Sequence, residues 1–122
     1  MNNLMPFKKS INTIKLHYVR EGYWIGHILS IDVGVCKGSH LHLIVVGKGA
    51  KYYMRASRSI NRLLMVLDGE CIITSPHSKN NIEAGRGDII FIPVAFPVTI
   101  HNASEDYLRL LVLSIPQEPI SP

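Results

Sequence analysis

Histidine and cysteine side chains could bind a metal or act as acid, base or nucleophile in this 122-residue chain. His40 and His42 stand two residues apart, a spacing that puts both imidazoles on one face of a β-strand, as in a pair of metal ligands. We expect Leu41, Leu43 and Val45 to face the core instead, because they form the alternating apolar set. Both histidines would then lie at the surface or in an interface. The remaining histidines have no partner at a useful spacing: His17, His27, His77 and His101.

Cysteine and charge patterns exclude several classes of function. Cys36 and Cys71 are too few and too isolated for a disulfide framework or a zinc cluster, so we interpret both as small buried apolar residues. The net charge of +4 permits an acidic ligand without requiring one. No basic run extends beyond Lys8 and Lys9, and no helix-turn-helix pattern is present, so we expect no nucleic-acid partner. No membrane span or signal peptide is recognisable, which predicts a cytoplasmic protein without a membrane partner.

The elements that must position any site are predicted to be strands. The chain contains 16 Ile and 9 Val, and these β-branched residues favour strands over helices. Short apolar stretches alternate with Gly, Asn, Asp and Pro, a pattern typical of an all-β sandwich or barrel. We expect an N-terminal arm at 1–12, one β domain at 13–115 and an irregular, proline-rich tail at 116–122. The arm could cover a sheet edge or cross to a second subunit. Strands are predicted at residues 13–20, 23–35, 41–46, 51–56, 62–67, 70–74, 89–92, 98–101 and 107–114.

Two spaced patterns of glycine, proline and asparagine resemble the motifs of the cupin superfamily. Gly87, Pro93 and Asn102 match the framework of the second motif, G-x5-P-x-G-x2-H-x3-N. Gly49 and Gly69 match the outer glycines of the first motif, G-x5-H-x-H-x4-E-x6-G. The resemblance covers about residues 41–114 and implies a double-sheet jelly roll. Ala95 replaces the middle glycine of the second motif.

The resemblance fails at the positions that carry cupin chemistry. In cupins, the histidines and the glutamate of the two motifs point into the barrel and hold a divalent metal. Here these positions are Arg55, Ser57, Arg62 and Val98. None of them is a good ligand for a metal dication, because arginine has no free lone pair, valine has no donor atom and serine is a weak donor. We therefore predict no metal at this site, no cofactor and no metal-dependent reaction.

Two arginines at inward-facing positions predict an anionic ligand. An unpaired buried charge would cost several kcal/mol, and bidentate contacts to a carboxylate or sugar phosphate would offset that cost. The predicted ligand-binding residues are Arg55, Ser57, Arg62, Tyr53 and Val98. Tyr53 is included because it shares the strand face of Arg55. Alternatively, the arginines reach water at the barrel mouth, or they pair with Glu70 or Asp88.

Three functions remain open from the sequence. The first is a metal-free cupin-like module that binds a small anionic molecule. The second is a metal-independent isomerase or epimerase of sugar phosphates or sugar nucleotides, for which no general base is visible, because alternation points His101 outward. The third is a structural domain without a ligand. We predict no catalytic residue, and we expect a homodimer.

Overall fold

The computed structural model describes residues 6–20, 22–32 and 37–117. A short 3-10 turn, η1 (Ile11–Thr13), precedes the strands. The first sheet has six strands in the order β1-β2-β3-β10-β5-β8, and the second has four in the order β4-β9-β6-β7. The strand bounds are β1 (His17–Arg20), β2 (Tyr23–Ile31), β3 (Ser39–Val46), β4 (Lys51–Met54), β5 (Ile60–Asp68), β6 (Glu70–Ser75), β7 (Ser78–Gly85), β8 (Ile89–Ile92), β9 (Val98–Asn102) and β10 (Leu108–Pro116). Among the described residues, no helix is long and apolar enough to cross a membrane.

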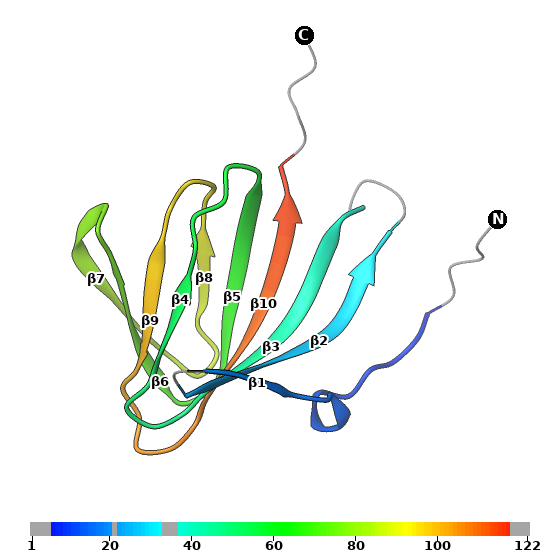
Figure 1. Ribbon diagram of the computed structural model, residues 1–122, viewed down its shortest axis with the longest axis horizontal. Helices are drawn as coiled ribbons and strands as arrows, with labels where there is room; N and C mark the ends of the chain where they lie inside the picture. The colour runs from blue at the N-terminus through cyan, green and yellow to red at the C-terminus, as the bar shows by residue number, and fades with distance from the viewer. Residues whose placement is uncertain (1–5, 21, 33–36, 118–122) are drawn as a thin grey trace, which may run out of the picture.

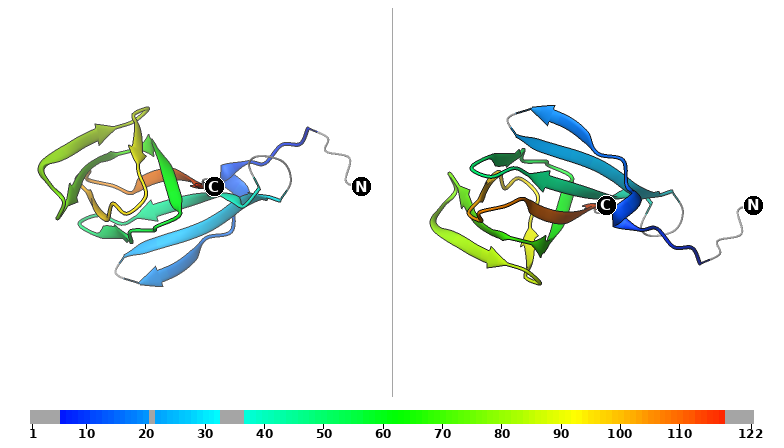
Figure 2. Two further views of the ribbon diagram at one scale, coloured as in Figure 1. Left: turned by 90° about the horizontal axis from the view of Figure 1, so that it is seen from above. Right: turned by 90° about the horizontal axis from the view of Figure 1, so that it is seen from below.

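The two antiparallel sheets pack face to face and form a double-sheet jelly roll (Figure 1), as the sequence predicts. β3, β10, β5 and β8 form one wall and β4, β9, β6 and β7 the other. β1 and β2 continue the larger sheet beyond the barrel (Figure 2). The core between the walls is apolar at its centre, where the inward residues are mostly Ile, Val and Leu, together with Met54, Cys71 and Ala84. Its most buried members are Ile44, Val46, Leu64, Val66, Cys71, Ile100, Leu108 and Leu110.

A second apolar cluster lies on the outer face of the six-stranded sheet. Leu43, Val45 and Ile28 form its buried centre, and Ile11 and Ile14 of the N-terminal arm pack against it. The arm approaches the sheet closely at Gly26, where a Cβ atom would lie 2.6 Å from Ile14 Cγ2. The arm therefore covers part of the face of its own sheet.

This second cluster corrects the predicted orientation of β3. Leu43 and Val45 belong to the outer cluster, whereas Ile44 and Val46 belong to the core between the sheets. His40 and His42 share the face of Ile44, because side chains alternate along a strand. The histidines therefore face inward. Apolar residues occupy both faces of β3, so the sequence pattern could not tell which face meets the opposite sheet.

β7 is a strand that the sequence analysis missed. From the sequence, residues 79–81 are predicted to form a polar loop, but they lie in the first half of the strand Ser78–Gly85. Six of the eight residues of this strand are exposed and only Ala84 is buried. β7 is the edge strand of its sheet and pairs with β6 alone. An edge strand with solvent on most of its surface lacks the apolar alternation by which strands are recognised.

Candidate functional site

A row of polar side chains crosses the inner face of the larger sheet near the barrel mouth. Directly paired residues of neighbouring antiparallel strands point to the same face. Ser30 pairs with His40, His40 with Ser114, and Ser114 with Arg62. These four residues, the polar row, lie near the start of β3 and β5 and the end of β10. These strand ends are at the top of Figure 1.

An irregularity in β2 brings Ser30 into the polar row. The register between β2 and β3 shifts between His27, which pairs with His42, and Leu29, which pairs with Leu41. Ile28 and Leu29 both pack in the outer cluster, although adjacent residues of a regular strand point to opposite faces. The shift therefore returns Ser30 to the inner face, beside His27.

Arg62 is the only arginine or lysine of the polar row. It is half-buried, and its Nη1 donates a hydrogen bond to the carbonyl oxygen of Arg55 at 3.1 Å. No carboxylate among the described residues forms an ion pair with Arg62. Asp88, one of the acids considered as its partner, accepts a hydrogen bond from the Gly85 amide at 2.8 Å.

Tyr52 lies close enough to Arg62 to be affected by its charge. Burial raises the pKa of the Tyr52 hydroxyl, and the nearby Arg62 guanidinium opposes that rise in pKa. The hydroxyl is therefore protonated at neutral pH. Tyr52 and Arg62 come from opposite sheets, so a charged group and a neutral hydroxyl lie near one another inside the barrel.

The structure brings only some of the sequence-predicted site residues together. Val98 is buried on the inner face of β9, where it adds apolar surface. Ser57 lies in the loop between β4 and β5, and its carbonyl oxygen accepts a hydrogen bond from Ala95 N at 2.6 Å. Arg55 is exposed just beyond the end of β4. Arg62 and Val98 therefore line the interior, whereas Ser57 and Arg55 lie in the loop that follows β4.

Tyr53 does not line the interior, contrary to its predicted orientation. Its neighbours Tyr52 and Met54 pack on the core between the sheets, and Tyr53 is 49% exposed. Lys51 lies over the Tyr53 ring, with Nζ 5.6 Å from the ring centroid. Tyr52 and Tyr53 are the same residue type, so the sequence pattern does not show which of the two side chains points into the barrel. Arg55 also lies past the end of the strand, so alternation does not extend to it.

His40 and His42, which the sequence analysis expected at the surface or in an interface, form a cluster with His27 at the end of the polar row. The ring centroids of His27 and His42 are 5.2 Å apart, those of His27 and His40 6.1 Å, and those of His40 and His42 6.2 Å. Burial, and then the nearby His27 and His40, lower the pKa of His42. The spacing of His40 and His42 hinted at this cluster. His27 joins it only through strand pairing, which the sequence does not specify.

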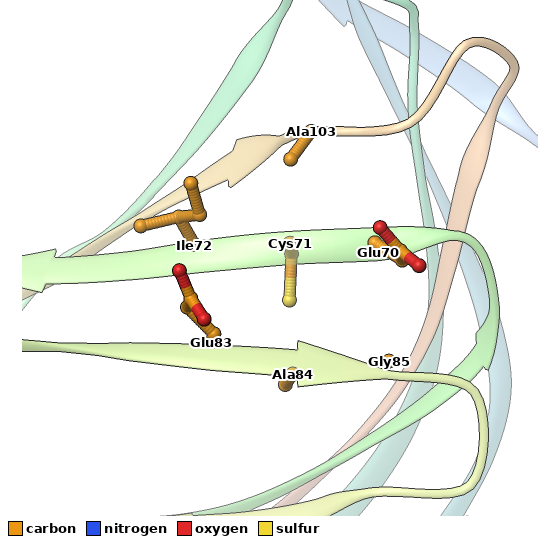
Figure 3. A pocket seen from close by; sticks show the side chains of 7 residues that line it. All are labelled: Glu70, Cys71, Ile72, Glu83, Ala84, Gly85 and Ala103. Carbon is orange, nitrogen blue, oxygen red and sulfur yellow. The ribbon is translucent and has the colours of Figure 1, made fainter.

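A separate cleft of about 350 Å³ lies along β6 and β7 (Figure 3). Glu70 and Glu83 contribute carboxylates to it, which would repel an anionic ligand. Cys71 is buried, and burial, followed by the charge of Asp88, raises the pKa of its thiol to about 11. A thiol with that pKa is protonated at neutral pH and is a poor nucleophile. This cleft therefore does not supply the anion site predicted from the sequence.

Comparison with known proteins defines the fold. No protein-family profile and no curated protein sequence matches this chain. The polyketide cyclase RemF from Streptomyces resistomycificus is similar in structure, with a TM-score of 0.74 and 21% identity over 93% of this chain and 81% of that one. A predicted oxalate decarboxylase from Thermotoga maritima has a TM-score of 0.75 and 13% identity, covering 90% and 99% of the two chains. The cupin domain of Schizosaccharomyces pombe Cnp3 has a TM-score of 0.73 and 12% identity, covering 90% and 74%. This chain has the cupin fold.

The metal that the cupin resemblance implies does not fit the residues at its motif positions. Arg62 presents a guanidinium there and Val98 a hydrocarbon, and neither can coordinate a dication. Ser57 uses its Oγ to accept a hydrogen bond from the Ser59 amide at 3.3 Å. Arg55, like Arg62, presents a guanidinium that cannot coordinate a dication. The residues at the motif positions therefore do not fit a divalent metal.

Proposed function

We propose that this protein binds a small anionic molecule, a carboxylate or a sugar phosphate, at the mouth of its barrel. The observation that carries the proposal is Arg62, a half-buried guanidinium on the inner face without a carboxylate partner among the described residues. A partly desolvated charge of this kind is stabilised by an anion that accepts two parallel N–H hydrogen bonds.

The surroundings of Arg62 suit an anion of limited size. Ser114 is its cross-strand neighbour and His40 the next residue of the polar row, and both can donate hydrogen bonds to phosphate or carboxylate oxygens. Below this row, Leu64 and Val112 belong to the apolar core. The proposed site thus combines a few polar groups with an apolar floor, the usual composition of small-molecule sites.

The test is a thermal-shift screen of sugar phosphates and carboxylates in buffer containing EDTA, followed by calorimetric titration of any hit. Ligand binding raises the apparent stability by mass action. We expect R62Q to weaken binding roughly 10- to 100-fold, since hydrogen bonds to charged groups contribute about 1.5–3 kcal/mol. K51Q is the matched control, because Lys51 is an exposed cation on the outer face of β4, away from Arg62. Equal affinities of R62Q and the unchanged protein would reject the proposal.

The same screen separates binding from catalysis. Structures that share this fold include one described as a polyketide cyclase and one as a predicted oxalate decarboxylase. Each ligand that binds should therefore be followed by NMR for conversion. Ligand recovered unchanged supports a binding module, and interconversion of sugar isomers or epimers supports the enzymatic alternative.

A further inference from the structure

The cluster of His27, His40 and His42 is a second chemical feature of the inner face, and the proposed anion site uses only His40 of the three. His40 and His42 are two residues apart on β3, and His27 is the direct cross-strand partner of His42 on β2. All three imidazoles lie on the inner face of the sheet, and their ring centroids are 5.2–6.2 Å apart. None of the three belongs to β4, β5 or β9, which carry or adjoin the cupin motif positions.

We propose that His27, His40 and His42 bind a transition-metal dication such as Zn²⁺. In zinc sites the metal–nitrogen distance is about 2.0–2.1 Å, and an imidazole centroid lies about 1.1 Å beyond the nitrogen, so three imidazoles arranged tetrahedrally have centroids roughly 5 Å apart. The observed ring separations exceed that value by about 1 Å or less. The strands therefore already hold the rings at close to the required spacing.

Metal binding requires the rings to turn. As the side chains stand, no three His, Cys, Asp or Glu groups within the described ranges are arranged to hold an ion. His27 and His40 are exposed, so their side-chain torsions can change without disturbing the core. The strand pairing already places His27 opposite His42, and His40 two residues from His42.

Ser30 occupies one nitrogen on each of two rings and leaves the others for a metal. Its Oγ is 2.7 Å from His27 Nε2 and 2.9 Å from His40 Nδ1. Within the described part of the chain, no hydrogen bond engages His27 Nδ1, His40 Nε2 or either nitrogen of His42. A ligating histidine commonly donates its second ring N–H to a neighbouring oxygen, which fixes its tautomer. Ser30 Oγ can accept both such hydrogen bonds.

The donor set defines the class of ion and the open coordination position. Three neutral imidazoles suit Zn²⁺, Cu²⁺ or Ni²⁺ rather than Mg²⁺ or Ca²⁺, which prefer oxygen ligands. Three protein ligands leave the fourth tetrahedral position to water or a small anion. This site shares His40 with the polar row but does not include Arg62, which lies two strands away from β3 in the sheet.

The test titrates the untagged full chain, stripped with EDTA and dialysed, with ZnCl₂ by calorimetry and with CoCl₂ by visible absorption. All variants are made in a C36S background, which removes the thiol of Cys36, a residue outside the described ranges. We expect one equivalent of Zn²⁺ to bind and Co²⁺ to give the strong visible bands of tetrahedral coordination. H42Q and H40Q should each weaken Zn²⁺ binding at least tenfold. H77Q, which changes an exposed histidine of the β6–β7 turn, should bind as the background protein does.

Several outcomes would overturn the site. The absence of saturable one-equivalent binding would do so, and so would unchanged affinity in H40Q, whose exposed position leaves the fold intact. Circular dichroism confirms that each variant is folded before titration. The titration contains no candidate anionic ligand and the anion screen contains EDTA. Failure of one proposal is therefore distinguishable from failure of the other.

Discussion

At the residue scale, the cupin resemblance rests partly on a side chain whose function is structural. Asn102 is 8% exposed, and its Nδ2 donates to the carbonyl oxygens of Val46, Gly47 and Asp106 at 2.8–3.0 Å. Its Oδ1 accepts from the Ser104 amide at 2.9 Å. One amide group thus ties the end of β9 to the end of β3 and to the loop before β10. Asparagine is needed at position 102 because these backbone groups would otherwise be buried without hydrogen-bond partners.

We predict that N102D lowers the free energy of unfolding by about 2–4 kcal/mol, because the carboxylate keeps the shape of Asn102 but cannot donate to buried carbonyls. Urea denaturation measures the change. N80D, at an exposed position of the edge strand β7, is the matched control and should change stability by less than about 0.5 kcal/mol. Similar losses in the two variants would show that the hydrogen bonds of Asn102 do not matter.

At the element scale, the turn between β8 and β9 explains a departure from the cupin pattern. Ala95 occupies the position of the middle glycine of the second motif, and its φ of 60° is the only positive value among non-glycine residues in the described part of the chain. Its amide donates to the Ser57 carbonyl, which ties this turn to the loop after β4. Ala95 therefore adopts the left-handed backbone conformation that glycine would adopt at this position. A side chain in this region costs about 1–2 kcal/mol.

We predict that A95G stabilises the protein by about 0.5–1 kcal/mol, because removal of the Cβ atom relieves the left-handed strain by more than glycine's added unfolded-state entropy costs. A103G is the comparison, since Ala103 is exposed and does not have a positive φ. Its stability should fall rather than rise. Thermal or urea unfolding of both variants checks the opposite signs, and destabilisation by A95G would contradict the account of the turn.

At the scale of the whole molecule, the outer face of the six-stranded sheet is apolar well beyond the part covered by the arm. Strand pairing sets two rows across β3, β10, β5 and β8. Phe91, Ile89 and Met65 are 58%, 61% and 37% exposed. A cavity of about 220 Å³ lies in this region, and every residue that lines it is apolar. The two rows are Leu41, Leu113, Leu63 and Phe91, and Leu43, Leu111, Met65 and Ile89.

We propose a second copy of this chain as the occupant of that face. The face continues the cluster that the protein's own arm already covers with Ile11 and Ile14. Phe7 of the same arm is 71% exposed and could extend the contact to a neighbouring copy. Two identical apolar faces related by a two-fold axis are self-complementary, and a core without charges is typical of homodimer interfaces.

We predict that light scattering after size exclusion gives twice the chain mass of 13.7 kDa. F91E should shift the mass to that of a monomer, because dimerisation would bury the new charge. I82E, at an exposed apolar position on β7 in the other sheet, should remain dimeric. A monomeric unchanged protein at micromolar concentration would contradict the self-association. A dimeric F91E would place the interface elsewhere.

The sequence by itself determined the all-β architecture, most of the strands and the framework of the two motifs. These features are local: β-branched apolar runs, turn glycines and a proline at a strand end each constrain the backbone wherever they occur. The residue types at Arg55, Arg62 and Val98 were also enough to argue against a metal at the motif positions. Only the tertiary structure decided which faces of β3 and β4 meet the opposite sheet. Alternation puts neighbouring side chains on opposite faces, but it does not say which face is inside when both are apolar. For the same reason the histidine cluster became visible only after the irregular register of β2 and β3 had brought His27 beside His42.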